Sequence, residues 1–202
     1  MMETNQAFQA HVSRPGRTRR MATTMVAAVI HGGEMTLANV GDSRGYLLRD
    51  NTATQITTDH SLVAGLVADG VLTPEEAAEH PQRNVILHSL GSTGNDPRID
   101  LFSHRLRPGD TIVLCTDGLT RYVDPVRLHQ LVQQQPLSEA AQRLVDHANQ
   151  SGGSDNVSVV VVRFIGRSTR VLRRGVWWML LLLGIVLVLV SGLVGAALLR
   201  WI

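Results

Sequence analysis

The chain has 202 residues, enough for one domain of ordinary size and an appendage. Lysine and arginine (19) nearly balance aspartate and glutamate (17), and 4% of the residues are aromatic. This composition lacks the basic excess and the stacking surface of a nucleic-acid-binding protein. The single cysteine, Cys115, excludes an internal disulfide and favours a reducing compartment.

The first part of the chain predicts a meander of antiparallel strands. A short amphipathic helix is expected over residues 5–12, followed by a Pro-Gly break. After it, β-branched and apolar runs alternate with short turn sequences, and connections this short join antiparallel strands. The expected strands cover residues 23–30, 35–40, 45–49 and 53–57.

From residue 61 the apolar period changes from two to about 3.6, which predicts helices. Thr73 and Glu76 form a capping-box pattern with Pro74 at the first helical position. Strands and helices then follow in blocks rather than as alternating βαβ units, which favours an α+β fold of two packed sheets with helices outside. The expected helices cover residues 61–69, 73–79, 126–134 and 138–150, and the expected strands cover 84–90, 99–106, 111–117 and 157–162.

The C-terminal segment, residues 176–199, is charge-free and dominated by Leu, Val and Gly. At about 1.5 Å per residue it would extend roughly 36 Å, which predicts a transmembrane helix rather than a buried core helix. Five arginines precede it between residues 163 and 174 and only Arg200 follows, so the positive-inside rule places the N-terminal domain in the cytoplasm. We therefore expect a single-pass protein of the cell membrane, with a domain over 1–166, a basic linker over 167–175 and the membrane span.

Three aspartates, Asp42, Asp117 and Asp155, stand at the ends of strongly apolar strands. Each alone is an ordinary turn residue. Strands so far apart in sequence can bring three carboxylates together only if they lie side by side, and such a cluster needs a cation because like charges repel. Oxygen ligands favour Mg²⁺ or Mn²⁺ over Zn²⁺. The residues therefore favour metal-assisted hydrolysis of a phosphate ester.

Five short motifs, in one order along the chain, resemble those of the bacterial metal-dependent serine/threonine phosphatases, the PPM or type 2C family. They lie at residues 21–24, 39–44, 58–61, 114–119 and 154–158. The resemblance implies a four-layer α-β-β-α sandwich of two antiparallel sheets. It also implies a binuclear Mn²⁺ or Mg²⁺ centre, where a bridging water attacks phosphoserine or phosphothreonine in phosphorylated proteins.

Individual residues can be matched to this pattern. Asp117 and Asp155 match metal ligands of the core centre, and Asp42 matches a ligand of the third metal in bacterial members. The two helices between residues 61 and 81 resemble the flap over the active site. His60 falls on a motif position, but we expect it to be a structural histidine.

The family's N-terminal motifs have no counterpart, since the only acids before Asp42 are Glu3 and Glu34. The aspartate that bridges the core metals, the phosphate-binding arginine and the proton-donating histidine are missing. We therefore expect a domain truncated at its N-terminus, without its first strands and weak or inactive as this chain.

Two alternatives remain open. One is a non-catalytic pseudophosphatase that binds a phosphoprotein or a partner at the membrane, and the other is a tail-anchored interaction domain whose aspartates only form turns. For a phosphatase, the topology suggests membrane-bound serine/threonine kinases and their substrates as partners.

Overall fold

The computed structural model describes residues 2–12, 22–92, 97–134 and 136–166. One compact unit covers Met1–Phe164, and a second begins at Ile165. The predicted linker (167–175) and membrane span (176–199) lie outside the described residues. Within the described part, no helix is both long enough and apolar enough to cross a bilayer.

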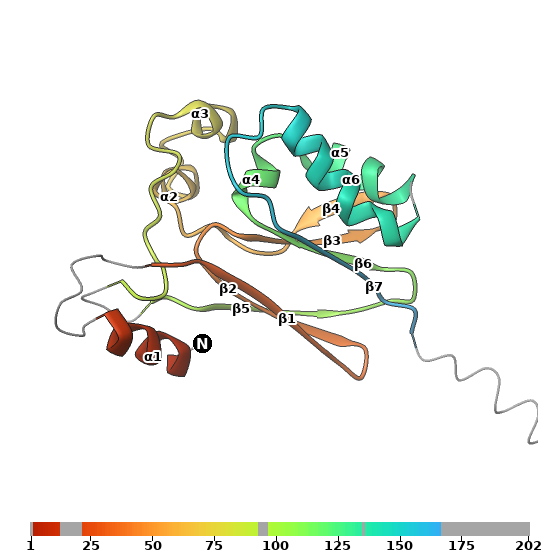
Figure 1. The fold of residues 1–202 in the computed structure, drawn as a ribbon, viewed down its shortest axis with the longest axis horizontal. Helices are drawn as coiled ribbons and strands as arrows, with labels where there is room; N and C mark the ends of the chain where they lie inside the picture. The colour runs from red at the N-terminus through yellow and green to blue at the C-terminus, as the bar shows by residue number, and fades with distance from the viewer. Residues whose placement is uncertain (1, 13–21, 93–96, 135, 167–202) are drawn as a thin grey trace, which may run out of the picture. The chain divides into compact units, whose positions relative to one another are not determined.

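Antiparallel strands form two sheets, one with the order β1-β2-β5 and the other with the order β4-β3-β6-β7 (Figure 1). The strands are β1 (Met25–His31), β2 (Glu34–Val40), β3 (Arg44–Arg49), β4 (Thr52–Gln55), β5 (Asp100–Arg105), β6 (Thr111–Cys115) and β7 (Val159–Arg163). The helices are α1 (Met2–Val12), α2 (Leu62–Ala68), α3 (Pro74–Glu79), α4 (Asp117–Thr120), α5 (Pro125–Gln133) and α6 (Leu137–Gln150).

Alternation along the strands divides the core into two layers. Tyr46 and Leu48 of β3 face a cluster with the apolar sides of α5 and α6, whereas Leu47 between them faces the other sheet. Cys115 belongs to the helix-facing cluster, where burial raises the pKa of its thiol to about 12. The thiol is therefore an inert core group, as its apolar surroundings in the sequence predict.

The three-stranded sheet packs against the four-stranded sheet through one face. Met35 and Leu37 of β2 are fully buried in this second cluster. On the opposite face, Val29 and Leu101 are 68% and 67% exposed. Three of the four predicted layers are therefore present: the two sheets and the helical layer of α5 and α6. On the remaining side, α1 is joined to the segment before β5 by the hydrogen bond from the Gly91 amide to the Asn5 side chain.

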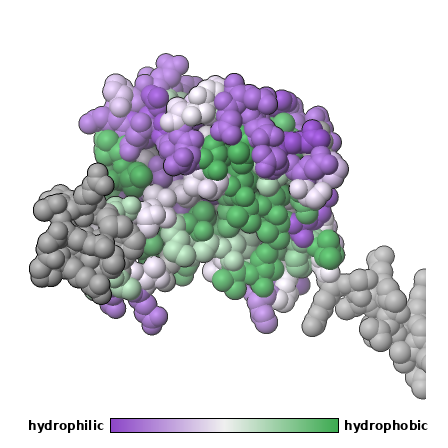
Figure 2. Space-filling model, viewed as in Figure 1, coloured by the Kyte–Doolittle hydropathy of each residue, from purple (hydrophilic) through white to green (hydrophobic). Residues whose placement is uncertain are grey.

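Apolar side chains also gather on the face where β1 and β7 lie (Figure 2). Both are outer strands among the described residues, and Ile30 of β1 and Val160 and Val162 of β7 are exposed. β1 and β7 therefore each expose apolar side chains at the outer edge of their own sheet.

Two sequence predictions are wrong in detail. Residues 84–90 form no strand, because the segment makes only isolated bridges, from Ile86 to Ser61 and from Leu90 to Thr23. The apolar run there is partly exposed and has no full partner strand. The predicted strand over 111–117 ends at Cys115, and Asp117 begins the short helix α4. The capping box at Thr73 is confirmed.

Candidate functional site

The three aspartates singled out from the sequence lie at the same end of the four-stranded sheet. Asp42 precedes β3, Asp117 follows β6 and Asp155 precedes β7. Because β6 lies between β3 and β7 and is antiparallel to both, the start of β3, the end of β6 and the start of β7 lie at the same end of the sheet. The prediction that these strands lie side by side is confirmed.

A glycine shapes the turn that carries Asp42. Gly41 has a φ of +107°, and a side chain there would collide with the Thr24 side chain, so the position requires glycine. The buried Asn39 side chain donates to the Gly41 carbonyl oxygen at 3.1 Å. The Gly41 amide in turn donates to Nδ1 of His60 at 3.2 Å. The turn is thus held on both sides before the chain reaches Asp42.

His60 is a structural residue, as expected. Since its Nδ1 accepts the Gly41 hydrogen bond, its proton lies on Nε2, which donates to Asp100 Oδ2 at 3.1 Å. The His60 side chain is 2% exposed. Both ring nitrogens are therefore engaged in holding the turn.

Asp117 is brought to its place by tight contact between the end of β6 and the start of β7. The Thr116 amide donates to the Ser158 carbonyl at 3.1 Å, and the Ser158 amide donates to Thr116 Oγ1 at 3.0 Å. A Cβ at Gly118 would collide with the Asn156 carbonyl oxygen and lie 3.0 Å from its carbon. Glycine at this position allows α4 to approach the loop that carries Asp155.

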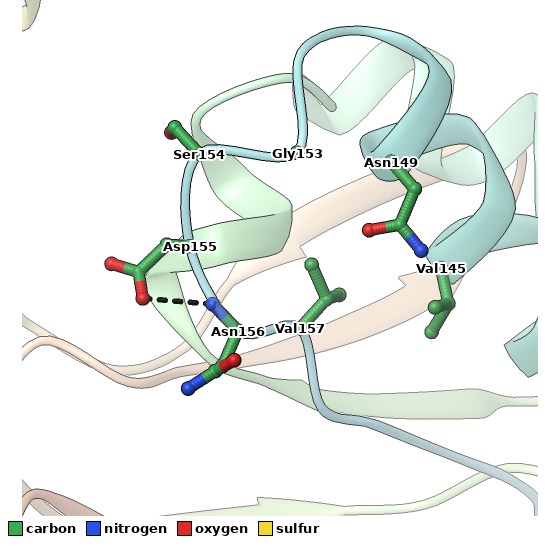
Figure 3. A pocket seen from close by; sticks show the side chains of 7 residues that line it. All are labelled: Val145, Asn149, Gly153, Ser154, Asp155, Asn156 and Val157. Atoms are coloured by element: carbon green, nitrogen blue, oxygen red, sulfur yellow. Dashed lines mark hydrogen bonds between the residues drawn. The ribbon is translucent and has the colours of Figure 1, made fainter.

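The loop before β7 is attached to α4 by a tyrosine. Tyr122 donates from its hydroxyl group to Ser154 Oγ at 2.8 Å. Figure 3 shows the Asp155 carboxylate, which accepts the Asn156 amide at 2.8 Å, turned away from Asn149. A hollow of about 510 Å³ lies between this loop and α6. Asp155 is among the residues that line this hollow, and its carboxylate points away from Asn149 of α6.

A guanidinium lies between two of the carboxylates. Arg121 Nη2 is 2.6 Å from Asp117 Oδ2 and 3.5 Å from Asp155 Oδ2. The hydrogen bond to Asp117 raises the pKa of Arg121, and the charges of Asp117, Asp155 and Asp42 add to the effect. The structure thus joins Asp117 and Asp155 through one cation.

Asp42 has no such ion pair among the described contacts. Burial raises the pKa of its carboxyl, and the charge of Asp117 raises it further. Carboxylate oxygens of this kind are the ligands that Mg²⁺ and Mn²⁺ prefer. However, within the described residues no three His, Cys, Asp or Glu side chains are grouped closely enough to hold a metal in their present positions.

Asp42 and Asp117 open into a pocket of about 990 Å³, whereas Asp155 lines the smaller hollow beside α6. Asp42, Asp117 and Arg121 form part of its wall, and residues of α2 and α3, among them Val67 and Ala77, form another part. Figure 1 shows α2 and α3 at the same end of the molecule as α4. The pocket therefore combines charged groups with an apolar wall, which is typical of ligand-binding sites.

Arg121 and Tyr122 were not singled out from the sequence. A signal was available for Arg121, which follows Asp117 by four residues and would meet it on one helical turn. The helix that brings them together was not predicted, because an Asp-Gly pair is typical of a tight turn between two elements and not of a helix. For Tyr122 no local signal exists, since its partner Ser154 is distant in sequence.

The sequence matches known proteins over the described unit. A family model described as stage II sporulation protein E (SpoIIE) matches residues 1–165. The serine/threonine phosphatase stp of Listeria welshimeri is 42% identical over 143 residues, which are 70% of this chain and 56% of that protein. The chain thus spans little more than half the length of this relative.

Solved structures agree in fold. A crystal structure of the Mycobacterium tuberculosis serine/threonine phosphatase PstP/Ppp superposes with a TM-score of 0.75 and 40% identity, covering 80% of this chain and 68% of that one. A structure of the PstP catalytic domain in complex with two manganese ions gives a TM-score of 0.70 and 37% identity, covering 80% and 67%.

Proposed function

The chain belongs to the PPM-type serine/threonine phosphatase family, and from this premise we propose that it hydrolyses phosphoserine and phosphothreonine in proteins, with weak activity as this chain. Mn²⁺ or Mg²⁺ would be held by Asp42, Asp117 and Asp155. The observation that carries the proposal is the strand order β3-β6-β7, which directs three strand ends with carboxylates to one edge of the sheet. The relative solved with two manganese ions supports the choice of metal.

Bound divalent ions would lower the pKa of a water and neutralise phosphate charge. The chain's own residues supply the setting. Asp42 and Asp117 present hard oxygen ligands to the pocket, and the hydrogen bond of Tyr122 to Ser154 fixes the loop that carries Asp155. The apolar residues of α2 and α3 in the pocket wall would exclude water from around the bound phosphoprotein.

The test is Mn²⁺-dependent release of phosphate from a phosphothreonine peptide by the full chain. Asp117→Asn and Asp155→Asn should each reduce the rate by roughly 100-fold or more, since each removes a charged ligand. Asp146→Asn is the matched control, because Asp146 is exposed on α6 and bonds only to Gln142 among the described contacts. Mn²⁺-dependent hydrolysis that survives both site substitutions would refute the assignment of the site.

A second function, a non-catalytic module that binds a phosphoprotein or another partner, is favoured by one observation. Arg121 already engages Asp117 and Asp155 in ion pairs. The carboxylates would then be structural, and the chain would be weak or inactive as an enzyme. A folded full chain that retains a phosphopeptide but releases no phosphate at millimolar Mn²⁺ would establish this alternative.

We further propose that residues 176–199 anchor the domain to the cytoplasmic face of the cell membrane, beside membrane-bound kinases and their substrates. The support is the apolar, charge-free segment and the arginines that precede it. A topology reporter fused to the N-terminus should be active only on the cytoplasmic side. A reporter signal from outside the cell would refute both the orientation and the kinase partnership.

A further inference from the structure

The side chain of Arg121 occupies the space between Asp117 and Asp155. Its Nη2 atom lies 2.6 Å from Asp117 Oδ2 and 3.5 Å from Asp155 Oδ2. The two carboxylates come from different loops, one after β6 and one before β7. A single flexible side chain therefore makes the electrostatic connection between them.

Local structure directs Arg121 to this place. It is the C-cap of α4, and its amide donates to the Asp117 carbonyl, so its side chain lies one turn from the Asp117 carboxylate. The side chain is 26% exposed and lines the pocket wall. The guanidinium therefore has open pocket space beside it.

Charge at this edge is not balanced by Arg121 alone. Three carboxyl groups, those of Asp42, Asp117 and Asp155, lie at this end of the sheet, and Arg121 is the one arginine paired with any of them among the described ion pairs. The neighbouring Arg44 is engaged elsewhere, in a two-pronged ion pair with Asp59 at 2.7 to 3.0 Å. Carboxylates left without enough positive charge favour a further cation, and Arg121 occupies the space between two of the three.

We propose that Arg121 is a displaceable counter-ion of the carboxylate site. In the metal-free chain it holds Asp117 and Asp155 together, and a divalent cation binds only when the guanidinium swings into the pocket. This inference rests on the proposed metal-dependent function. If Arg121 competes in this way, it lowers the affinity of the site for a metal. It also keeps Asp117 and Asp155 in place when no metal is bound.

A second ion pair of the same kind provides the comparison. Arg143 lies 2.7 Å from Glu139 on α6, also four residues apart, and both side chains are about half exposed. Unlike Arg121, it has no second acid among the described ion pairs. Exposed pairs of this type contribute little. Arg143→Gln therefore removes an equivalent pair without touching the pocket.

The test is a calorimetric titration of the full chain with Mn²⁺ alone, together with the melting temperature of the metal-free chain. We expect Arg121→Gln to bind Mn²⁺ roughly tenfold more tightly than the unaltered chain, because a competing positive charge is removed. Its metal-free form should melt earlier, and Arg143→Gln should match the unaltered chain in both measurements. If Arg121→Gln does not fold without metal, Arg121→Lys, which keeps the charge but not the planar fork, should still show a smaller gain in affinity.

The outcomes separate this inference from the proposed function. Mn²⁺ affinity that is equal or weaker in both Arg121 variants, with binding intact, refutes the counter-ion and leaves the metal site standing. Absence of Mn²⁺ binding in every variant refutes both.

Discussion

Replacing Gly118 with alanine tests whether close contact between α4 and the loop before β7 assembles the site. The added Cβ would collide with the Asn156 carbonyl oxygen and lie 3.0 Å from its carbon. Ordinary contact begins near 3.4 Å, so one segment must move. Because the obstacle is backbone rather than the end of a flexible side chain, α4 must move away from the loop, which separates Asp117 from Asp155.

The magnitude follows from two opposing effects. Overpacking a tight site costs about 3 kcal/mol at the upper end of its usual range. Alanine regains about 1 kcal/mol over glycine in a helix. The net loss is about 2 kcal/mol, which lowers the melting temperature of a domain this size by roughly 4–8 °C. The affinity for Mn²⁺ should fall as well, since the ligands no longer meet.

Thermal unfolding of the full chain, followed by circular dichroism, measures this loss of stability. A Mn²⁺ titration measures the affinity that is lost when Asp117 and Asp155 move apart. Gly65→Ala is the matched control, because an added Cβ at this position in α2 meets nothing within 4 Å. There the same substitution should stabilise by about 0.5–1 kcal/mol. If Gly118→Ala melts with or above the unaltered chain and binds Mn²⁺ equally well, the contact with Asn156 does not organise the site.

Three further outcomes are expected. The Arg49 guanidinium holds the pKa of Asp110 below its usual range, so this pair stabilises the fold above about pH 4 and its contribution is lost as the pH falls below that value. Asp110→Asn should lower the free energy of unfolding by about 2 kcal/mol at pH 7, measured by urea unfolding. Below about pH 4 the variant should lose less stability with falling pH than the unaltered chain. The same pH dependence in both proteins would contradict this. Burial and the charge of Asp117 raise the pKa of Asp42, so the ionised Asp42 destabilises the metal-free fold above about pH 4. Asp42→Asn should therefore raise the melting temperature of the metal-free chain at pH 7. The same variant should show a smaller rise in melting temperature when Mn²⁺ is added. A lower melting temperature would count against that sign. Thr73→Ala removes the capping box of α3 and should cost about 1 kcal/mol, seen as faster amide exchange in α3 while exchange in β6 is unchanged.

Strands were predictable where sequence pattern and tertiary pairing agree. The apolar runs before Asp117 and after Asp155 are strands in the structure, and their β-branched residues are typical of strands. The run at residues 84–90 has a similar pattern but finds no full partner strand. Pairing is decided by the rest of the fold, which a local pattern does not contain.

The candidate site was predictable in its acids but not in its basic residue. Asp42, Asp117 and Asp155 follow or precede strong strands, so the sequence predicts that they meet if these strands are neighbours, and the strand order β3-β6-β7 meets that condition. The position of Arg121 depends on α4, a helix of four residues that contains Gly118. Glycine is a poor helix former, and only contact with the next loop explains why the helix forms there.

The acids and the arginine are held in different ways, and this difference bears on function. Tyr46 and Leu48 face the helices while Leu47 faces the other sheet, so a slip of β3 by one residue would turn each of these side chains toward the wrong layer of the core. The core therefore sets the strand ends that carry the acids, independently of any charge. Arg121 reaches its partners only through a flexible side chain at the edge of a pocket. A cation could thus replace the guanidinium without any change in strand register, and the same fold could hold the site either with metal or closed by its own arginine.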